Sequence, residues 1–207
     1  ANAEDIDMKL VAFRGQSVSV SYNNGAQSFN RGVWAGRLEW QSQNDNSRFT
    51  NGESFYAFCV ELTQNANFGE TTCYKLGDAK DVASPAMGGG AGLSDGQEAA
   101  LTDLVANYWD EGTSGSKLQG AAFQLAVWEI VYEGKNVDFG DEGSAITGLN
   151  TDTGWFRASG NDSATDLADT WLSSLFNNGI NGSIFSMTSG ARQDQMAMAI
   201  VPLPAPA

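Results

Sequence analysis

Two stretches decide how this chain folds: FYAFCVEL, which spans Phe55–Leu62, and AAFQLAVWEIVYEG, which spans Ala121–Gly134. The first is short and aromatic, which predicts a strand, and Cys59 lies within it. The second is apolar almost all round, which predicts a buried helix around the carboxamide of Gln124. A buried carboxamide without partners costs about 1–3 kcal/mol, so Gln124 must be satisfied, either by strand backbone or by a covalent bond.

The two-residue period of a strand divides FYAFCVEL into two faces. Four side chains share one face and are predicted to be core: Tyr56, Phe58, Val60 and Leu62. Cys59 then lies on the opposite face with Ala57 and Glu61, toward the helices or solvent.

The rest of the chain predicts strands, then helices, then strands. Short alternating stretches over residues 6–76 indicate strands, and Ser94 with Gln97 forms a capping box at the start of the helices, which extend over about 94–178. Strands return over residues 183–201. We therefore expect one α+β domain over residues 1–207, a β-sandwich with an inserted segment of three helices.

Composition excludes several functions. The 207 residues include 25 acidic and 11 basic side chains, which give a net charge of −14 and disfavour nucleic acid as a partner. There is no histidine, which removes the commonest general base and metal ligand, and we expect no enzyme activity, no cofactor and no metal. Only weak surface calcium sites are conceivable, at Asn44–Ser47 and Asn150–Gly154. No apolar run reaches the 18 residues of a membrane span, and the start ANAEDID suggests a processed N-terminus.

The chain has two cysteines, Cys59 and Cys73. In an extracellular protein the common outcome is a disulfide, and closing this loop would stabilise the fold by about 3 kcal/mol. Two free thiols are the alternative from composition alone.

Two short motifs suggest a third state for Cys59. Phe58-Cys59-Val60 and the stretch FQLAVW at Phe123–Trp128 resemble the cysteine and glutamine motifs of thioester domains in bacterial surface adhesins. The resemblance implies an internal thioester between Cys59 and Gln124 that an amine on a partner surface would attack, and a fold like that of those domains.

The C-terminus suggests a cellular location. Val201, Pro202, Leu203, Pro204 and Ala205 spell VPLPA, which resembles the sorting signal of one variety of PEP-CTERM proteins. The resemblance implies a secreted protein of the extracellular matrix or cell surface of a Gram-negative bacterium, active in biofilm formation. Further stretches similar to that class are Ser17–Gly25, Trp34–Gly36, Phe58–Gln64, Ala121–Gly134, Asp166–Leu172 and Gln193–Gln195.

We therefore expect a structural surface protein that assembles into fibres or oligomers by strand pairing. The segment proposed to pair is apolar on both faces and includes Met196, Met198, Ile200 and Val201. The alternatives are a covalent adhesin and a module that binds extracellular polysaccharide, in which an exposed tryptophan stacks on sugar. The tryptophans considered for this role are Trp34, Trp40, Trp109 and Trp155. A hydrolase with paired carboxylates would draw on Glu61, Glu129 and Glu133.

Overall fold

Seven strands and three α-helices make up the part of the chain that the computed structural model describes, which is residues 4–82, 92–134, 137–177, 184–190 and 192–198. The strands are β1 (Glu4–Asn23), β2 (Ser28–Ser42), β3 (Ser54–Cys59), β4 (Thr71–Asp78), β5 (Phe156–Ser159), β6 (Ile184–Thr188) and β7 (Gln195–Met198). The helices are α1 (Asp95–Ser114), α2 (Lys117–Tyr132) and α3 (Asp162–Leu172), and a 3-10 turn η1 spans Ala79–Asp81. The expected α+β class with three helices is confirmed.

All seven strands belong to one antiparallel sheet. The order is β2-β3-β7-β6-β4-β1-β5, and β1 also pairs with β2, so six of the strands close into a ring to which β5 is added at β1. Closure depends on the 20-residue length of β1, which pairs with β4 through Glu4–Lys9 and with β2 from Met8 to Asn23. The strands therefore form one closed sheet and not the predicted β-sandwich. This is possible because β1 is long enough to pair with β4 at one end and with β2 along the rest of its length.

A β-bulge in β1 changes which of its faces is buried. The register with β2 shifts between Leu10 and Ala12, so even-numbered residues before and after it point to opposite sides. Ile6, Met8 and Leu10 are buried inside the ring. Beyond the bulge the buried residues of β1 are Val18, Val20 and Tyr22, on the side that α2 covers. One strand thus contributes to two layers of the core.

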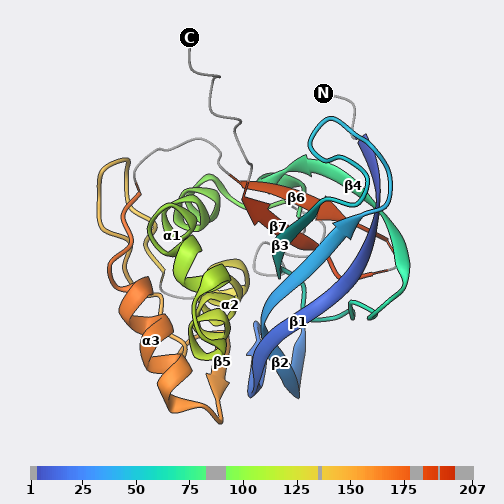
Figure 1. The fold of residues 1–207 in the computed structure, drawn as a ribbon. Helices are drawn as coiled ribbons and strands as arrows, with labels where there is room; N and C mark the ends of the chain where they lie inside the picture. Colours follow the sequence, from blue (N-terminus) through green and yellow to red (C-terminus); the bar gives the residue numbers. More distant parts are fainter. Residues whose placement is uncertain (1–3, 83–91, 135–136, 178–183, 191, 199–207) are drawn as a thin grey trace.

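Helix α2 lies between the sheet and the other two helices, as Figure 1 shows. It packs against β1, β2 and β3 on one side and against α1 and α3 on the other. Ser94 and Ser116 form capping boxes at the starts of α1 and α2, the first of which the sequence predicts. From Gly120 to Tyr132 every residue of α2 is buried, as its apolar composition predicts.

The core prediction for Phe55–Leu62 is correct at three of its four residues. Phe58, Val60 and Leu62 are buried, and Phe58 packs against Trp109 and Phe123 of the helices. Tyr56 is half-exposed instead. The opposite face, with Ala57 and Cys59, is also buried because it lines the interior of the ring. Cys59 therefore faces neither the helices nor open solvent.

Two elements differ from the sequence prediction. Strand β5 was not predicted, because its four residues follow a Gly- and Asp-rich stretch that indicates a loop. Helix α3 ends at Leu172, short of the expected limit near Asn178. Beyond it the chain turns back, and the carbonyl of Leu175 accepts a hydrogen bond from the amide of Ile146.

Candidate functional site

Gln124 and Cys59 meet, but through the backbone of Cys59. The Cys59 N–H donates to Oε1 of Gln124 at 2.9 Å, and Nε2 of Gln124 donates to the Cys59 carbonyl at 2.7 Å. The pairing of β2 with β3 stops at Leu38 and Ala57, so the edge of β3 at Cys59 has lost its strand neighbour. The carboxamide takes the place of that neighbour. Hydrogen bonds to strand backbone, one of the two expected ways to satisfy Gln124, are present.

The Cys59 thiol has different partners. Its Sγ donates to Oε1 of Gln193 at 2.9 Å, and Nε2 of Gln195 lies 3.6 Å away. Burial raises the pKa of the Cys59 thiol to about 12, a shift that the contact with Gln195 only reduces. At neutral pH the group is a protonated thiol and a weak nucleophile.

The expected Cys59–Cys73 disulfide is not formed, since both residues are free cysteines. Strand β3 is separated from β4 by β7 and β6 in the order of the sheet. Tyr74 is buried inside the ring, so its neighbour Cys73 points outward. The two thiols therefore lie on different sides of the sheet, which sequence spacing alone does not reveal.

A groove of about 590 Å³ follows the unpaired outer edge of β2 and reaches Cys59. One wall is β2 from Arg31 to Trp34, and the other is the loop from Leu62 to Phe68. This loop is anchored on β1 by the Gly69 N–H, which donates to the Leu10 carbonyl at 3.0 Å. The β-bulge and the end of the β2–β3 pairing together open the groove at this place.

Aromatic side chains form the rim of the groove. Trp34 and Phe68 are each 67% exposed, the most of any large hydrophobic side chain that the structure describes. Phe13 supports Trp34 with an edge-to-face contact at 6.2 Å between ring centroids. Folding normally buries such side chains, and two of them facing one groove indicate a surface that contacts something else.

Polar side chains also line the groove, and Nδ2 of one of them, Asn67, donates to Glu70 at 2.9 Å. Gln64, Asn65 and Asn67 supply carboxamides along the loop wall. At the base lies the buried Trp128, whose indole N–H has no hydrogen-bond acceptor among the described residues. A buried indole N–H normally has an acceptor, so this unpaired donor is unusual among the groups of the residues that line the groove.

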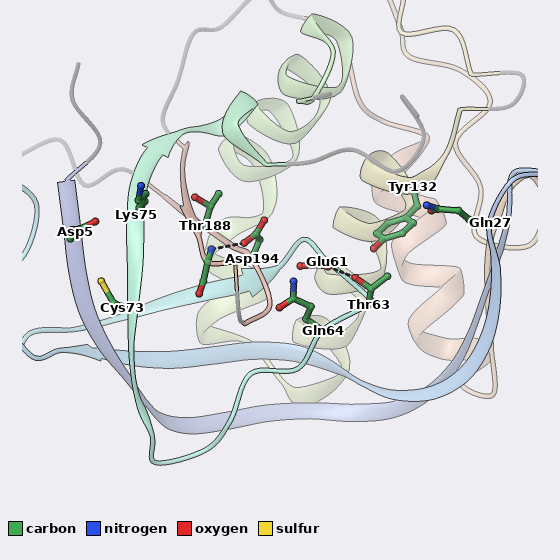
Figure 2. Close-up of a pocket in the computed structure, with 12 residues that line it drawn as sticks. Asp5, Gln27, Glu61, Thr63, Gln64, Cys73, Lys75, Tyr132, Thr188 and Asp194 are labelled. Atoms are coloured by element: carbon green, nitrogen blue, oxygen red, sulfur yellow. Dashed lines mark hydrogen bonds between the residues drawn. The ribbon is translucent and has the colours of Figure 1, made fainter. Parts of the chain in front are cut away.

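A second cavity, of about 740 Å³, has a different chemistry (Figure 2). Asp5, Glu61 and Asp194 line it, with Lys75 as its single basic residue. Burial raises the pKa of Asp194 to about 6, and the charge of Glu61 adds to this shift. By contrast, the groove along β2 has no acidic lining residue and one basic residue, Arg31.

Three of the tryptophans considered for sugar stacking lie elsewhere. Trp40 is buried inside the ring, and Trp109 and Trp155 are half-buried. Phe68 and Trp128 were not predicted as site residues, since the former lies in a loop without a motif and the latter in an apolar helix. Only the hydrophobic Phe68 between polar neighbours in NANFGE gave a hint.

The strand proposed for assembly is part of the protein's own sheet. Strand β7 pairs with β3 through Met196 and with β6 through Met198, so both of its edges are occupied. Ile200 lies outside the described residues, as do Val201, Pro202, Leu203, Pro204 and Ala205 of the VPLPA stretch.

Glu129 of α2 and Glu133 just after its end stabilise the fold. Glu129 accepts a hydrogen bond from the Asn150 N–H at 2.8 Å, and Glu133 accepts one from the Trp155 N–H at 2.6 Å. Burial raises the pKa of Glu129 well above its ordinary value. Within the described residues no group of three or more acidic or cysteine side chains is placed to hold a metal ion, and no helix is long and apolar enough to cross a membrane.

In comparisons with known proteins, no family model matches the chain, and no curated protein or solved structure matches it either.

Proposed function

We propose that the chain is a surface or matrix protein that binds an extracellular polysaccharide in the groove along β2. The observation that carries this proposal is the pair of aromatic rings, Trp34 and Phe68, each 67% exposed, on a groove lined with carboxamides. The extracellular location rests on the resemblance of Val201–Ala205 to a sorting signal.

Sugars match this combination of groups. The apolar faces of sugar rings pack on exposed aromatic side chains, and their hydroxyls both donate and accept hydrogen bonds. Gln64, Asn65 and Asn67 carry amide donors and carbonyl acceptors, of which Nδ2 of Asn67 already donates to Glu70. The indole N–H of Trp128, which also lines the groove, is buried and has no acceptor among the described residues. A polymer is favoured over a small ligand because the groove is open and follows the edge of a strand.

Binding to soluble oligosaccharides and polysaccharides, measured by titration calorimetry, tests the proposal. Trp34→Ala and Phe68→Ala should each weaken binding by about 1–1.4 kcal/mol, or roughly five- to tenfold. Phe176→Ala is the matched control, since Phe176 is 47% exposed and does not line the groove. Equal affinities for all four proteins would reject the groove as the binding site.

A Cys59–Gln124 thioester is the second candidate, favoured by the contact of the Gln124 carboxamide with Cys59. Formation would require the thiol to leave Gln193 and its sulfur to attack the side-chain carbonyl carbon of Gln124. The C–N bond breaks, the thiol proton goes to the leaving nitrogen, and ammonia departs. An amine on a partner would then attack the thioester carbonyl carbon, take over the acyl group and release the Cys59 thiol, a step that requires the buried Cys59 to open toward the groove that it lines.

Intact mass in denaturant decides this candidate. A thioester lowers the mass by one ammonia, and methylamine restores this loss with a further gain for its methyl group. Gln124→Ala should show no deficit, whereas Gln193→Ala should retain it. A wild-type protein of full mass with two alkylatable thiols would reject the thioester.

Assembly by strand pairing is a further part of the proposed matrix role, supported by a different strand from the one expected. The outer edge of β2 from Ser28 to Gly36 pairs with no strand in the described part of the chain. It carries a single charge, on Arg31, and no proline, so little protects it from pairing with another chain.

A further inference from the structure

We infer that the polymer bound along β2 is an acidic polysaccharide, whose carboxylate groups are recognised by Arg31. This inference rests on the proposed function and adds the chemical class of the ligand. It is carried by the distribution of charge around the groove.

No acidic residue lines the groove in this strongly acidic protein, and the one carboxylate that contacts its lining through Asn67, that of Glu70, is paired with Arg192. The net charge of the chain is −14, yet residues 10–38, which form most of the β1–β2 ribbon, contain three arginines and no acidic residue. None of the groove's lining residues is acidic, whereas Asp5, Glu61 and Asp194 line the second cavity (Figure 2). An anion therefore meets less repulsion in this groove than in the second cavity.

Of the three arginines, Arg31 is the one placed to bind a ligand. Arg37 is buried and donates to the carbonyls of Gly112 and Gly115 at the end of α1. Arg14 does not line the groove. Arg31 does line it, its guanidinium lies 5.1 Å from the centre of the Phe29 ring, and none of the ion pairs in the described residues involves it.

The guanidinium is suited to a carboxylate. It presents a planar set of N–H donors that match two carboxylate oxygens, and its stacking on Phe29 limits the orientations it adopts. Uronic acid residues combine such a carboxylate with a sugar ring that packs on Trp34 or Phe68. An acidic peptide would supply the charge but not the ring, which is why we favour the saccharide.

A comparison of polygalacturonate with its fully methyl-esterified form distinguishes recognition of the carboxylate from recognition of the sugar ring. In calorimetry at about 0.15 M salt, where repulsion beyond about 8 Å is screened, the acid polymer should bind roughly tenfold more tightly than the ester. Arg31→Gln should abolish this preference, so that the acid polymer and the ester bind with equal affinity. Arg14→Gln is the matched control and should retain the preference, and Arg31→Lys should retain part of it.

The outcomes distinguish this inference from the proposed function. Equal binding of acid and ester, weakened in both cases by Trp34→Ala, would overturn the carboxylate preference and leave the groove as a saccharide site. A preference that persists in Arg31→Gln would overturn the role of Arg31. Polyglutamate that binds as tightly as polygalacturonate would overturn the saccharide class. Failure of acid, ester and neutral polysaccharides alike would overturn both proposals.

Discussion

Replacing Gln124 by methionine tests the structural role of its carboxamide. Methionine fills nearly the same volume but forms no hydrogen bonds, so the Cys59 N–H and carbonyl lose their bonds of 2.9 and 2.7 Å in a fully buried place. Each orphaned buried group costs about 1–3 kcal/mol, which gives a loss of roughly 2–6 kcal/mol in the free energy of unfolding. That is a large share of the 5–15 kcal/mol typical of a folded domain.

Urea denaturation followed by circular dichroism measures this loss. Gln27→Met is the control, because Gln27 is exposed and its exchange should change the free energy of unfolding by less than about 0.5 kcal/mol. Cys59→Ala keeps both backbone bonds and should be less destabilising than Gln124→Met. Two results would contradict the conclusion that the Gln124 carboxamide takes the place of a neighbouring strand. One is a loss below about 1 kcal/mol in the free energy of unfolding of Gln124→Met, and the other is an equal loss in Gln124→Met and Cys59→Ala.

The remaining predictions concern pH, the thiols and assembly. The folded-state pKa of Asp194, about 6, lies above its unfolded value, so its stabilising contribution is full below about pH 4 and is lost as pH rises through about 6. The Asp194→Asn variant keeps the acceptor for the Ser189 N–H but has no carboxyl group to titrate. Its free energy of unfolding, measured in urea, should therefore fall less than that of the wild type between about pH 4 and about pH 6. The same pH dependence in both proteins would contradict this. Iodoacetamide should label Cys73 in the native protein and Cys59 only in denaturant, as counted by mass; early labelling of Cys59 would contradict its burial. Oligomers detected by light scattering should weaken in Asn30→Lys, which adds a charge to the free edge of β2, and a wild type that is monomeric at high concentration would contradict assembly.

Local patterns in the sequence predict the helices better than the arrangement of the strands. The capping box of Ser94 and Gln97 and the apolar character of Ala121–Gly134 each identify a helix, because caps and burial act over a few residues. Ring closure depends on one long strand and a bulge at Leu10–Ala12. A shift of one residue reverses the faces of everything that follows, and no local pattern marks it.

The site was predictable only in part. The sequence indicates that Gln124 requires partners, with strand backbone as one option, and its carboxamide is found on the backbone N–H and carbonyl of Cys59. The sequence also offers Trp34 as one of four candidate tryptophans but does not single it out. The exposure of the Trp34 side chain depends on where the pairing of β2 with β3 ends, which the sequence does not show. Phe68 and Trp128 join the groove from a loop and a helix far apart in sequence, a proximity that only tertiary structure creates.

The most direct measurement of saccharide binding in the groove is the set of tryptophan indole N–H signals in a ¹H–¹⁵N NMR spectrum during titration with oligogalacturonate. The chain has 6 tryptophans, of which Trp34 and Trp128 line the groove, Trp40 is buried in the ring, and Trp155 lines a separate cavity. We predict that the signals of Trp34 and Trp128 shift with one common dissociation constant while those of Trp40 and Trp155 stay in place. Binding that shifts Trp155 and leaves Trp34 unchanged, or no shift at saturating oligosaccharide, would contradict the proposed function.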